Sequence, residues 1–373
     1  MIGMLIEPMD TLFFRDGTPF SSGSASQDDV GGLFPPHPAT VAGAVRAFLA
    51  RCQGWNGRGR WPNELDAVLG DGPTSLGKLW LYGPFVVWNE QPLFPVPRHL
   101  MGLVEQGQWR PHVFLRPGPA QPCDLGQRVR LPEPSRGAVK AEELETGDGH
   151  WLTRDGLEAV LQGRLPDPDT VVSAATLWAE EPRVGIARDR LTRTAQEGML
   201  YSTRHVRPAR GLALGVGLTG VPNHWKIPDH ALITLGGEGR MAACRPWDWG
   251  TCLDVPEPET CREGRVTLIA LTPLDLGEAT PTAAPSWEGA SLVSACTDRP
   301  QRIGGWDSLK RRPLPLRSVW RPGSVLFCEI DDDDRFRASL ESPTGLQQVG
   351  SQRPLGFGGV ALGVWPDDEP EVN

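Results

Sequence analysis

The chain has 373 residues, which is long enough for two domains that each bury a core of their own. Hydrophobic residues make up 39% and charged residues 22% of the sequence, and no apolar run approaches the roughly 20 residues of a membrane span, so the disordered and membrane-spanning classes are excluded. The formal net charge of −9 excludes a generally basic coat that would bind nucleic acid over the whole surface.

Apolar periodicity predicts the first two elements. Residues 1–7 alternate weakly between apolar and polar side chains and are expected to form a strand. A helix should begin at Pro38, because the missing N–H of proline costs nothing in a first turn. Its spacing places Val41, Val45 and Phe48 on one apolar face.

The later elements are short and are separated by turns. Residues 79–88 predict a strand pair or one bent strand, and residues 157–161 predict a short helix that Thr153 caps. The proline- and glycine-rich stretch at about 98–165 predicts an irregular, partly mobile insertion. Further strands are expected over residues 206–217, 232–235, 266–271, 325–330 and 355–364. This order fits an α+β fold of two ferredoxin-like βαββαβ units.

Cysteines and acidic residues do not form a convincing metal motif. Seven cysteines are scattered without a CxxC pair, which indicates reduced thiols, and Cys244, Cys252 and Cys261 are spaced too loosely for zinc. The tetrad Asp331–Asp334 is more typical of a solvated turn. Residues Met1–Asp10 are too acidic for a signal peptide, so we expect a cytoplasmic protein without metal, cofactor or membrane contact.

A glycine-rich run, Arg353–Gly363, is the most informative stretch of the chain. Gly356, Gly358 and Gly359 can adopt positive φ and could present main-chain N–H groups to the phosphates of a polyanion. Phe357 could stack on a base or fill the core beneath the loop, and we favour the core. The alternative for the whole run is a tight structural turn between two strands.

Positive charge is concentrated in two segments. Residues 183–210 hold seven arginines and two acidic residues, and residues 302–321 hold six basic residues and one aspartate. Acidic residues gather elsewhere, at 142–148, 331–334 and 367–371. This separation indicates one basic face with acidic edges, although ordinary solvated charge is the alternative.

The N-terminal run Glu7–Phe20 (EPMDTLFFRDGTPF) resembles the opening signature of the Cmr3 family. That family supplies the third subunit of the type III-B CRISPR effector and belongs to the RAMP superfamily. Other stretches resemble the same family in the same order: residues 34–46 (FPPHPATVAGAVR), 181–190 (EPRVGIARDR), 198–201 (GMLY), 303–307 (IGGWD) and the terminal glycine run. The insertion at about 98–165 carries little of the resemblance.

This resemblance implies a non-catalytic subunit with two modified ferredoxin-like, RRM-related domains and long loop insertions. We place the first domain at residues 1–210 and the second at 211–373. The resemblance implies that the subunit holds the repeat-derived 5′ tag of the CRISPR RNA. Its partners would be the large polymerase-like subunit, the backbone RAMP subunits and, indirectly, the target RNA.

Candidate RNA-binding residues combine the resemblance with charge. Arg15 could reach a phosphate or pair with Asp16, and His37 and Thr40 could bind phosphate at a helix N-terminus or simply cap it. Arginines of the first basic segment are the best electrostatic candidates. The full predicted set is Arg15, His37, Thr40, Arg46, Arg188, Arg190, Arg193, Arg204, Arg207, Arg353, Gly356, Phe357, Gly358 and Gly359.

Catalytic interpretations are weaker, so we expect no catalytic residue. Residues 72–78 match the P-loop spacing GxxxxGK, but Leu79 stands where a hydroxyl must bind Mg²⁺. His205 could be the general acid of a RAMP endoribonuclease that processes precursor CRISPR RNA, although a packed or surface histidine is favoured. A third alternative is a protein-interaction subunit in which the glycine run is only structural.

Overall fold

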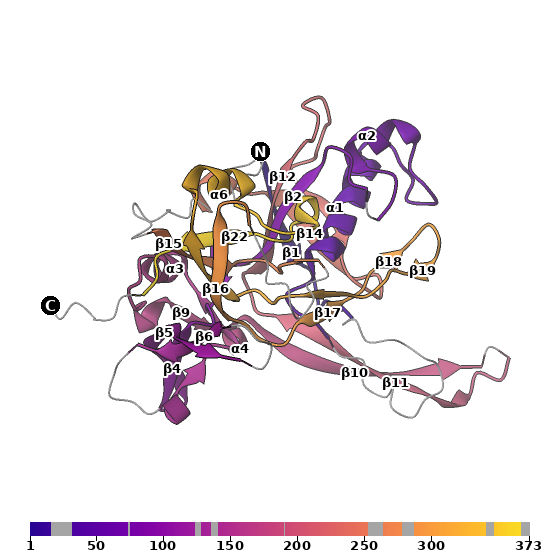
Figure 1. The fold of residues 1–373 in the computed structure, drawn as a ribbon. Helices are drawn as coiled ribbons and strands as arrows, with labels where there is room; N and C mark the ends of the chain where they lie inside the picture. The colour runs from indigo at the N-terminus through magenta and orange to yellow at the C-terminus, as the bar shows by residue number, and fades with distance from the viewer. Residues whose placement is uncertain are drawn as a thin grey trace. The chain divides into compact units, whose positions relative to one another are not determined.

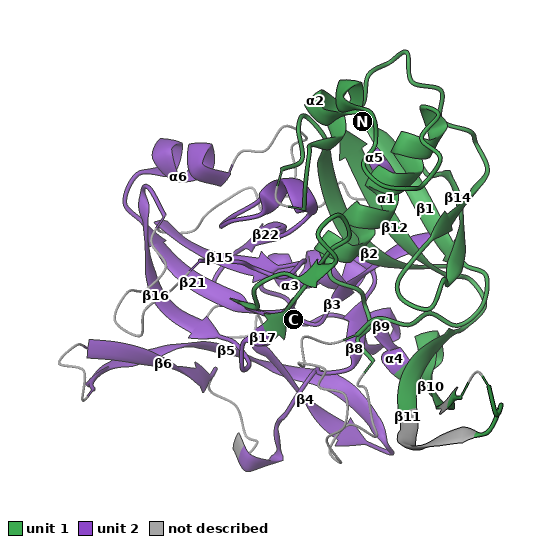
Figure 2. Ribbon diagram, turned by 90° about the vertical axis from the view of Figure 1, so that its right-hand side faces the viewer, with its two compact units in different colours: residues 1–89, 175–248, 302–318 green, residues 90–174, 249–301, 319–373 purple. Residues whose placement is uncertain are grey.

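The computed structural model describes residues 1–15, 32–73, 75–123, 128–135, 141–189, 191–252, 264–277, 287–340 and 347–366. They form two compact units, of which the first contains residues 1–89, 175–248 and 302–318 and the second residues 90–174, 249–301 and 319–373 (Figure 2). These units differ from the domains predicted at 1–210 and 211–373. The predicted boundary would separate residues 212–219 from the strands of the first unit with which they pair.

The first unit contains an antiparallel sheet in the order β13-β14-β1-β12-β2. The strands are β1 (Ile2–Pro8), β2 (Trp80–Trp88), β12 (Leu212–Thr219), β13 (Ala231–Thr234) and β14 (Met241–Pro246). Residues 212–218 of β12 are all buried, as expected of a central strand that is covered on both faces. The strand predicted at residues 1–7 and the single bent strand at 79–88 are confirmed.

Helix α1 (Pro38–Cys52) packs against β2 and β13. Pro38 occupies the first turn, and Val41, Val45 and Phe48 are buried, so the predicted start and apolar face are confirmed. Shorter elements of this unit are η1 (Asn63–Leu65), α2 (Asp66–Leu69), β18 (Trp306–Asp307) and β19 (Arg312–Pro313).

A long two-stranded ribbon, β10 (Trp178–Arg188) with β11 (Ala195–Pro208), also belongs to the first unit (Figure 1). A bridge between Leu12 and Val206 joins its base to the chain segment that follows β1. The strand predicted over residues 206–217 is therefore two strands, because the chain turns at Gly211, whose φ is +84°.

The second unit contains an antiparallel sheet in the order β16-β21-β15-β22, formed by β15 (Arg265–Ala270), β16 (Ala290–Cys296), β21 (Val325–Ile330) and β22 (Val360–Gly363). Phe336 and Leu340 of α6 (Asp333–Leu340) are buried in the core of this sheet. The tetrad Asp331–Asp334 is therefore not a simple turn. Asp332 Oδ1 accepts a hydrogen bond from the N–H of Arg335 at 3.1 Å, which caps α6, and the acids that follow complement the helix dipole.

Regular strands occupy much of the predicted irregular insertion, so that prediction is wrong for the described residues. A four-stranded sheet has the order β6-β5-β4-β7, with β4 (Leu100–Glu105), β5 (Gln108–Pro122), β6 (Arg128–Pro134) and β7 (Glu145–Thr146). Residues 108–114 of β5 pair with β4, and residues 115–122 pair with β6. Each half of β5 thus has one unpaired edge in this sheet, which tolerates prolines that lack an N–H donor.

The remaining strands of the second unit flank a capped helix. They are β3 (Gln91–Pro95), β8 (His150–Leu152) and β9 (Val171–Ser173). Thr153 accepts a hydrogen bond from the N–H of Gly156 and begins α3 (Arg154–Leu161), as predicted. Short elements elsewhere are η2 (Ala141–Glu143), η3 (Pro168–Thr170), α4 (Ala174–Leu177), α5 (Trp249–Cys252), β17 (Gln301–Ile303), β20 (Arg317–Val319) and η5 (Arg353–Leu355).

The chain is thus a mixed protein of mostly antiparallel sheets and few helices. The orders β14-β1-β12-β2 and β22-β15-β21-β16 match the fourth-first-third-second order of an antiparallel βαββαβ unit. In the first sheet only the helix after β1 is present, and in the second only the helix after β21, within the ranges described above. Complete ferredoxin-like domains therefore remain a prediction. None of the described helices has the length and apolar character needed to cross a bilayer.

Candidate functional site

The glycine run folds as a buried turn in the second unit. Residues 355–359 are all buried, and only 2% of Phe357 is exposed, so Phe357 fills the core as we favoured. Gly356 and Gly358 adopt φ values of +100° and +77°, which are rare for L-residues with a side chain. A Cβ on Gly358 would lie 1.9 Å from the carbonyl oxygen of Val349, so only glycine fits there.

The main-chain donors that we expected to bind phosphate have partners inside the protein. Gly356 donates to the Arg353 carbonyl at 2.9 Å, Gly358 to the Pro273 carbonyl at 2.9 Å, and Gly359 to Thr272 Oγ1 at 2.8 Å. These N–H groups would have to give up buried hydrogen bonds before they could reach a ligand. The arrangement favours a structural turn in which Arg353 also takes part, since its Nη1 donates to the Gln348 carbonyl.

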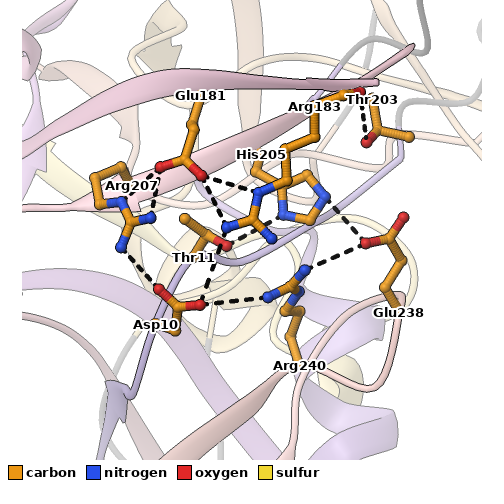
Figure 3. Close-up of polar contacts among 9 residues, drawn as sticks. All are labelled: Asp10, Thr11, Glu181, Arg183, Thr203, His205, Arg207, Glu238 and Arg240. Carbon is orange, nitrogen blue, oxygen red and sulfur yellow. Dashed lines mark hydrogen bonds and ion pairs between the residues drawn. The ribbon is translucent and has the colours of Figure 1, made fainter. Parts of the chain in front are cut away.

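Arginines near the base of the β10-β11 ribbon are held in ion pairs (Figure 3). Arg207 bridges two carboxylates, with nitrogen–oxygen distances of 2.7 Å to Asp10 and 2.6 Å to Glu181. Arg183 lies 2.8 Å from the same Glu181 carboxylate. Hydrogen bonds from Arg183 and Arg207 hold the pKa of Glu181 below its ordinary value. Asp10 and Glu181 therefore already neutralise much of the positive charge that the sequence places here.

His205 lies beneath this network with a fully buried side chain (Figure 3). Its Nδ1 is 3.2 Å from Thr11 Oγ1, its Nε2 is 3.1 Å from a Glu238 oxygen, and its ring stacks on Phe13 at a centroid distance of 5.1 Å. Burial lowers the pKa of His205, although Glu238 opposes that shift. A buried imidazole that is held in this way lacks the access to solvent-borne RNA that a general acid needs.

Farther along the ribbon, carboxylates neutralise less of the positive charge of the predicted arginines. Arg188 and Arg193 are exposed, and the Arg188 guanidinium donates to the Arg193 carbonyl at 3.0 and 3.2 Å and to no acid of the described residues. Arg204 is also exposed, but it lies nearer the base, opposite Pro182, and pairs with Glu180 at 3.3 Å. Arg190 lies outside the described residues. The ribbon is thus neutralised near its base and more positive toward its tip.

The N-terminus of α1 brings His37 and Thr40 together. His37 is the N-cap residue, but its side chain makes no capping hydrogen bond, and its buried Nε2 has no hydrogen-bond partner among the described residues. Burial lowers the pKa of His37 to about 4, so the imidazole is neutral at physiological pH. Thr40 is exposed, as is Arg15, whose backbone bridges to Gly32.

Arg46 is buried inside the first unit. Its Nη2 donates to the carbonyl oxygens of Gly72 at 2.8 Å and Ser75 at 3.0 Å, and its guanidinium lies 5.1 Å from the Trp61 ring centroid. Burial lowers the pKa of Arg46 to about 10. These contacts give Arg46 a structural role, because it satisfies main-chain acceptors of the segment that follows α2. The sequence alone indicated only that Arg46 lies off the apolar face of a helix.

The second basic segment, which sequence reasoning counted but did not select, is widely exposed. Residues 302, 304–306, 308–313 and 315–318 are all exposed, and they include Trp306. The signal in the sequence was an aromatic residue shortly before a cluster of basic residues, in the stretch IGGWDSLKRR.

Thiols and acidic residues give no sign of a metal centre in the described ranges. Within them, no three His, Cys, Asp or Glu side chains gather closely enough to hold an ion. Cys244, Cys296 and Cys328 are buried, and burial raises the pKa of each thiol to about 12. Of the other two cysteines in the predicted loose set, Cys261 lies outside the described residues, and Cys252 ends α5.

Comparisons with known proteins decide the family. A model of the family described as "CRISPR-associated protein (Cas_Cmr3)" matches residues 4–365. The chain belongs to the Cas_Cmr3 family. The match covers nearly the whole chain, including the residues at about 98–165, where the sequence resemblance was weak. Membership therefore applies to both compact units.

Solved structures of similar fold agree with this family. One is a chain of the "Cryo-EM structure of the Type III-B Cmr-beta bound to cognate target RNA", with 18% identity, a TM-score of 0.51 and 95% of each chain covered. Another is a chain of the same complex "bound to cognate target RNA and AMPPnP, state 1", with 18% identity, a TM-score of 0.50, and 87% of this chain and 86% of that chain covered. At this identity the likeness concerns the fold. No curated protein matched the chain.

Proposed function

We propose that this chain is a non-catalytic, RNA-binding and assembly subunit of a type III-B CRISPR effector complex. It holds the repeat-derived 5′ tag of the CRISPR RNA beside the large polymerase-like subunit and the first backbone RAMP subunit. The observation that carries the proposal is membership of the Cas_Cmr3 family over residues 4–365. The similar folds support it, because they belong to type III-B Cmr complexes bound to cognate target RNA.

The exposed cations are the residues that we propose to contact RNA. Arg188 and Arg193 lead this set because neither forms an ion pair with a carboxylate in the described part of the chain. Arg190, between them in sequence, and Arg15 stay in the set. Thr40, whose side chain is exposed, and His37, whose imidazole is buried and neutral, stay as uncharged candidates at the N-terminus of α1. Arg46 and the glycine run support the fold instead, since Arg46 Nη2 and the N–H groups of Gly356, Gly358 and Gly359 are bound internally. Arg204 and Arg207 position the ribbon through their ion pairs.

We also infer that both units are modified ferredoxin-like domains. The strand orders support this inference, and each sheet keeps one of the two crossover helices. In such RRM-related domains the sheet and its neighbouring loops form the usual RNA-binding surface.

Reversing the charge of Arg188 and Arg193 tests the RNA-binding role. The Arg188→Glu, Arg193→Glu variant should bind guide RNA that carries the 5′ tag at least about tenfold more weakly at low salt. The slope of log affinity against log salt should flatten by about 1 for each phosphate that the variant no longer neutralises. Fluorescence anisotropy over a salt series measures both quantities.

The matched control is Arg335→Glu, Arg337→Glu, which makes the same charge change on α6, where both arginines already pair with aspartates. This control should bind RNA as the wild type does. Equal losses in the two double variants would mean that only net charge matters, and unchanged binding in the ribbon variant would remove these arginines from the proposed site.

Absence of cleavage separates this function from the endoribonuclease alternative. Labelled repeat RNA should stay intact during incubation with the full chain, because His205, the candidate general acid at the base of the β10-β11 ribbon, is buried. Gel electrophoresis of the RNA checks this result. Cleavage that His205→Gln abolishes, with the unfolding midpoint unchanged, would establish the alternative function.

A further inference from the structure

The β18-β19 hairpin of the first unit is closed by an aspartate. Asp307 is buried, and its Oδ1 accepts hydrogen bonds from the N–H groups of Leu309 at 3.1 Å and Lys310 at 3.0 Å. Trp306 pairs with Pro313 across the hairpin, next to the pair of Asp307 with Arg312. The acidic side chain of the hairpin is therefore bound to main-chain N–H groups inside the turn, and it holds the turn that follows Trp306.

Trp306 is the feature of the hairpin that packing does not explain. Its side chain is 60% exposed, and in the described ranges it has no ring partner and no hydrogen-bond partner for its indole. Large aromatic side chains are usually buried because each removes a large apolar area from water. A tryptophan left in solvent on a hairpin that is well fixed by Asp307 is available for a flat ligand.

Several basic residues lie close to Trp306 in the sequence. Arg302, Lys310, Arg311 and Arg312 are exposed, and none of them pairs with a carboxylate of the described residues. Arg207, in contrast, bridges two carboxylates at the base of the β10-β11 ribbon. The exposed cations of the hairpin are thus uncompensated within the described residues, as Arg188 and Arg193 of the ribbon are, and this favours a polyanionic ligand.

We propose that Trp306 is a stacking platform for an unpaired base of single-stranded RNA, with Lys310 and Arg312 contacting the flanking phosphates. The proposal rests on the RNA-binding function proposed above and assigns a further site to it. Leu309 and Leu316 are also about half exposed, so a protein surface is the competing occupant. The uncompensated cations favour RNA, because stacking on an aromatic ring beside a basic groove is how single strands are bound without strict sequence preference.

Base removal provides the test. The full chain, Trp306→Ala and Trp306→Phe would be titrated with a single-stranded RNA of about ten nucleotides and with the same RNA carrying abasic sites. Trp306→Ala should lose about tenfold in affinity for the intact RNA, and Trp306→Phe should recover most of it. On the abasic RNA all three proteins should bind alike, because only phosphates remain.

Two controls keep the result specific. Leu232→Ala removes another exposed apolar side chain of the same unit and should leave binding unchanged. Lys310→Glu, Arg312→Glu should weaken binding to both RNAs, unlike Arg335→Glu, Arg337→Glu on the acidic helix α6.

Failure of this inference is distinguishable from failure of the proposed function. If the wild type binds tagged guide RNA and Trp306→Ala binds it with the same affinity, the stacking site alone is overturned. The same outcome with loss of assembly into the complex would assign the hairpin to a protein partner. A wild-type chain that binds no RNA would overturn the proposed function and the stacking site together.

Discussion

Alanine at Gly358 should lower the free energy of unfolding by about 3 to 5 kcal/mol. A positive φ of +77° strains any L-residue with a side chain, and the new Cβ would lie 1.9 Å from the Val349 carbonyl oxygen. The two segments cannot simply separate, because the N–H of Val349 donates to the Gly358 carbonyl at 2.9 Å. Urea unfolding, followed by circular dichroism, measures the loss.

Gly277 is the matched control for this substitution. It has the same φ of +77° in the same unit, but a Cβ there would meet no atom of the described residues within 4 Å. Gly277→Ala should therefore cost only the backbone strain of about 1 to 2 kcal/mol. If Gly358→Ala unfolds like the wild type but loses affinity for tagged RNA, the run is a phosphate-binding loop and its structural role is refuted.

Local signals in the sequence predicted the elements that depend on neighbouring residues. Pro38 begins α1 and Thr153 caps α3 as predicted, because capping involves residues within one helical turn. Prolines were misleading at β5, since each half of that strand pairs along only one edge and so tolerates residues without an N–H. Asp331–Asp334 was misleading because acids suit both a turn and a helix N-terminus.

The candidate site depended on partners that are distant in sequence, which charge counting cannot supply. Arg207 meets Asp10, 197 positions away, and Arg46 meets the Gly72 carbonyl. The glycine run likewise satisfies its N–H groups with residues 272 and 273. The division into two units could not be predicted from the order of the sequence, because each unit combines three separate chain segments. The residue types indicated which groups could bind phosphate, and the fold determines which of those arginines and N–H groups are not already bound inside the protein.

Acidification should destabilise the second unit through His99. This imidazole is 1% exposed, and its ring centroid lies 5.1 Å from that of Phe114 and 6.0 Å from that of Phe327. Burial lowers its pKa from 6.5 to about 3. Protonation in the folded state would place a charge among apolar rings, and the buried Nδ1 has no hydrogen-bond partner in the described part of the chain.

The sign of the effect follows from proton uptake. Between pH 6.5 and about 3 the unfolded chain binds a proton at His99 and the folded chain does not, so stability is highest above pH 6.5 and falls as pH decreases. At about pH 4.5 this residue alone should cost roughly 2 to 3 kcal/mol, which His99→Phe should remove from the pH dependence of unfolding. His112→Phe, at an exposed position of the same unit, is the control and should keep the wild-type profile. Urea unfolding at about pH 7.5 and 4.5 makes the comparison. If the wild type and His99→Phe lose the same free energy of unfolding between these two pH values, His99 is hydrated in the folded protein.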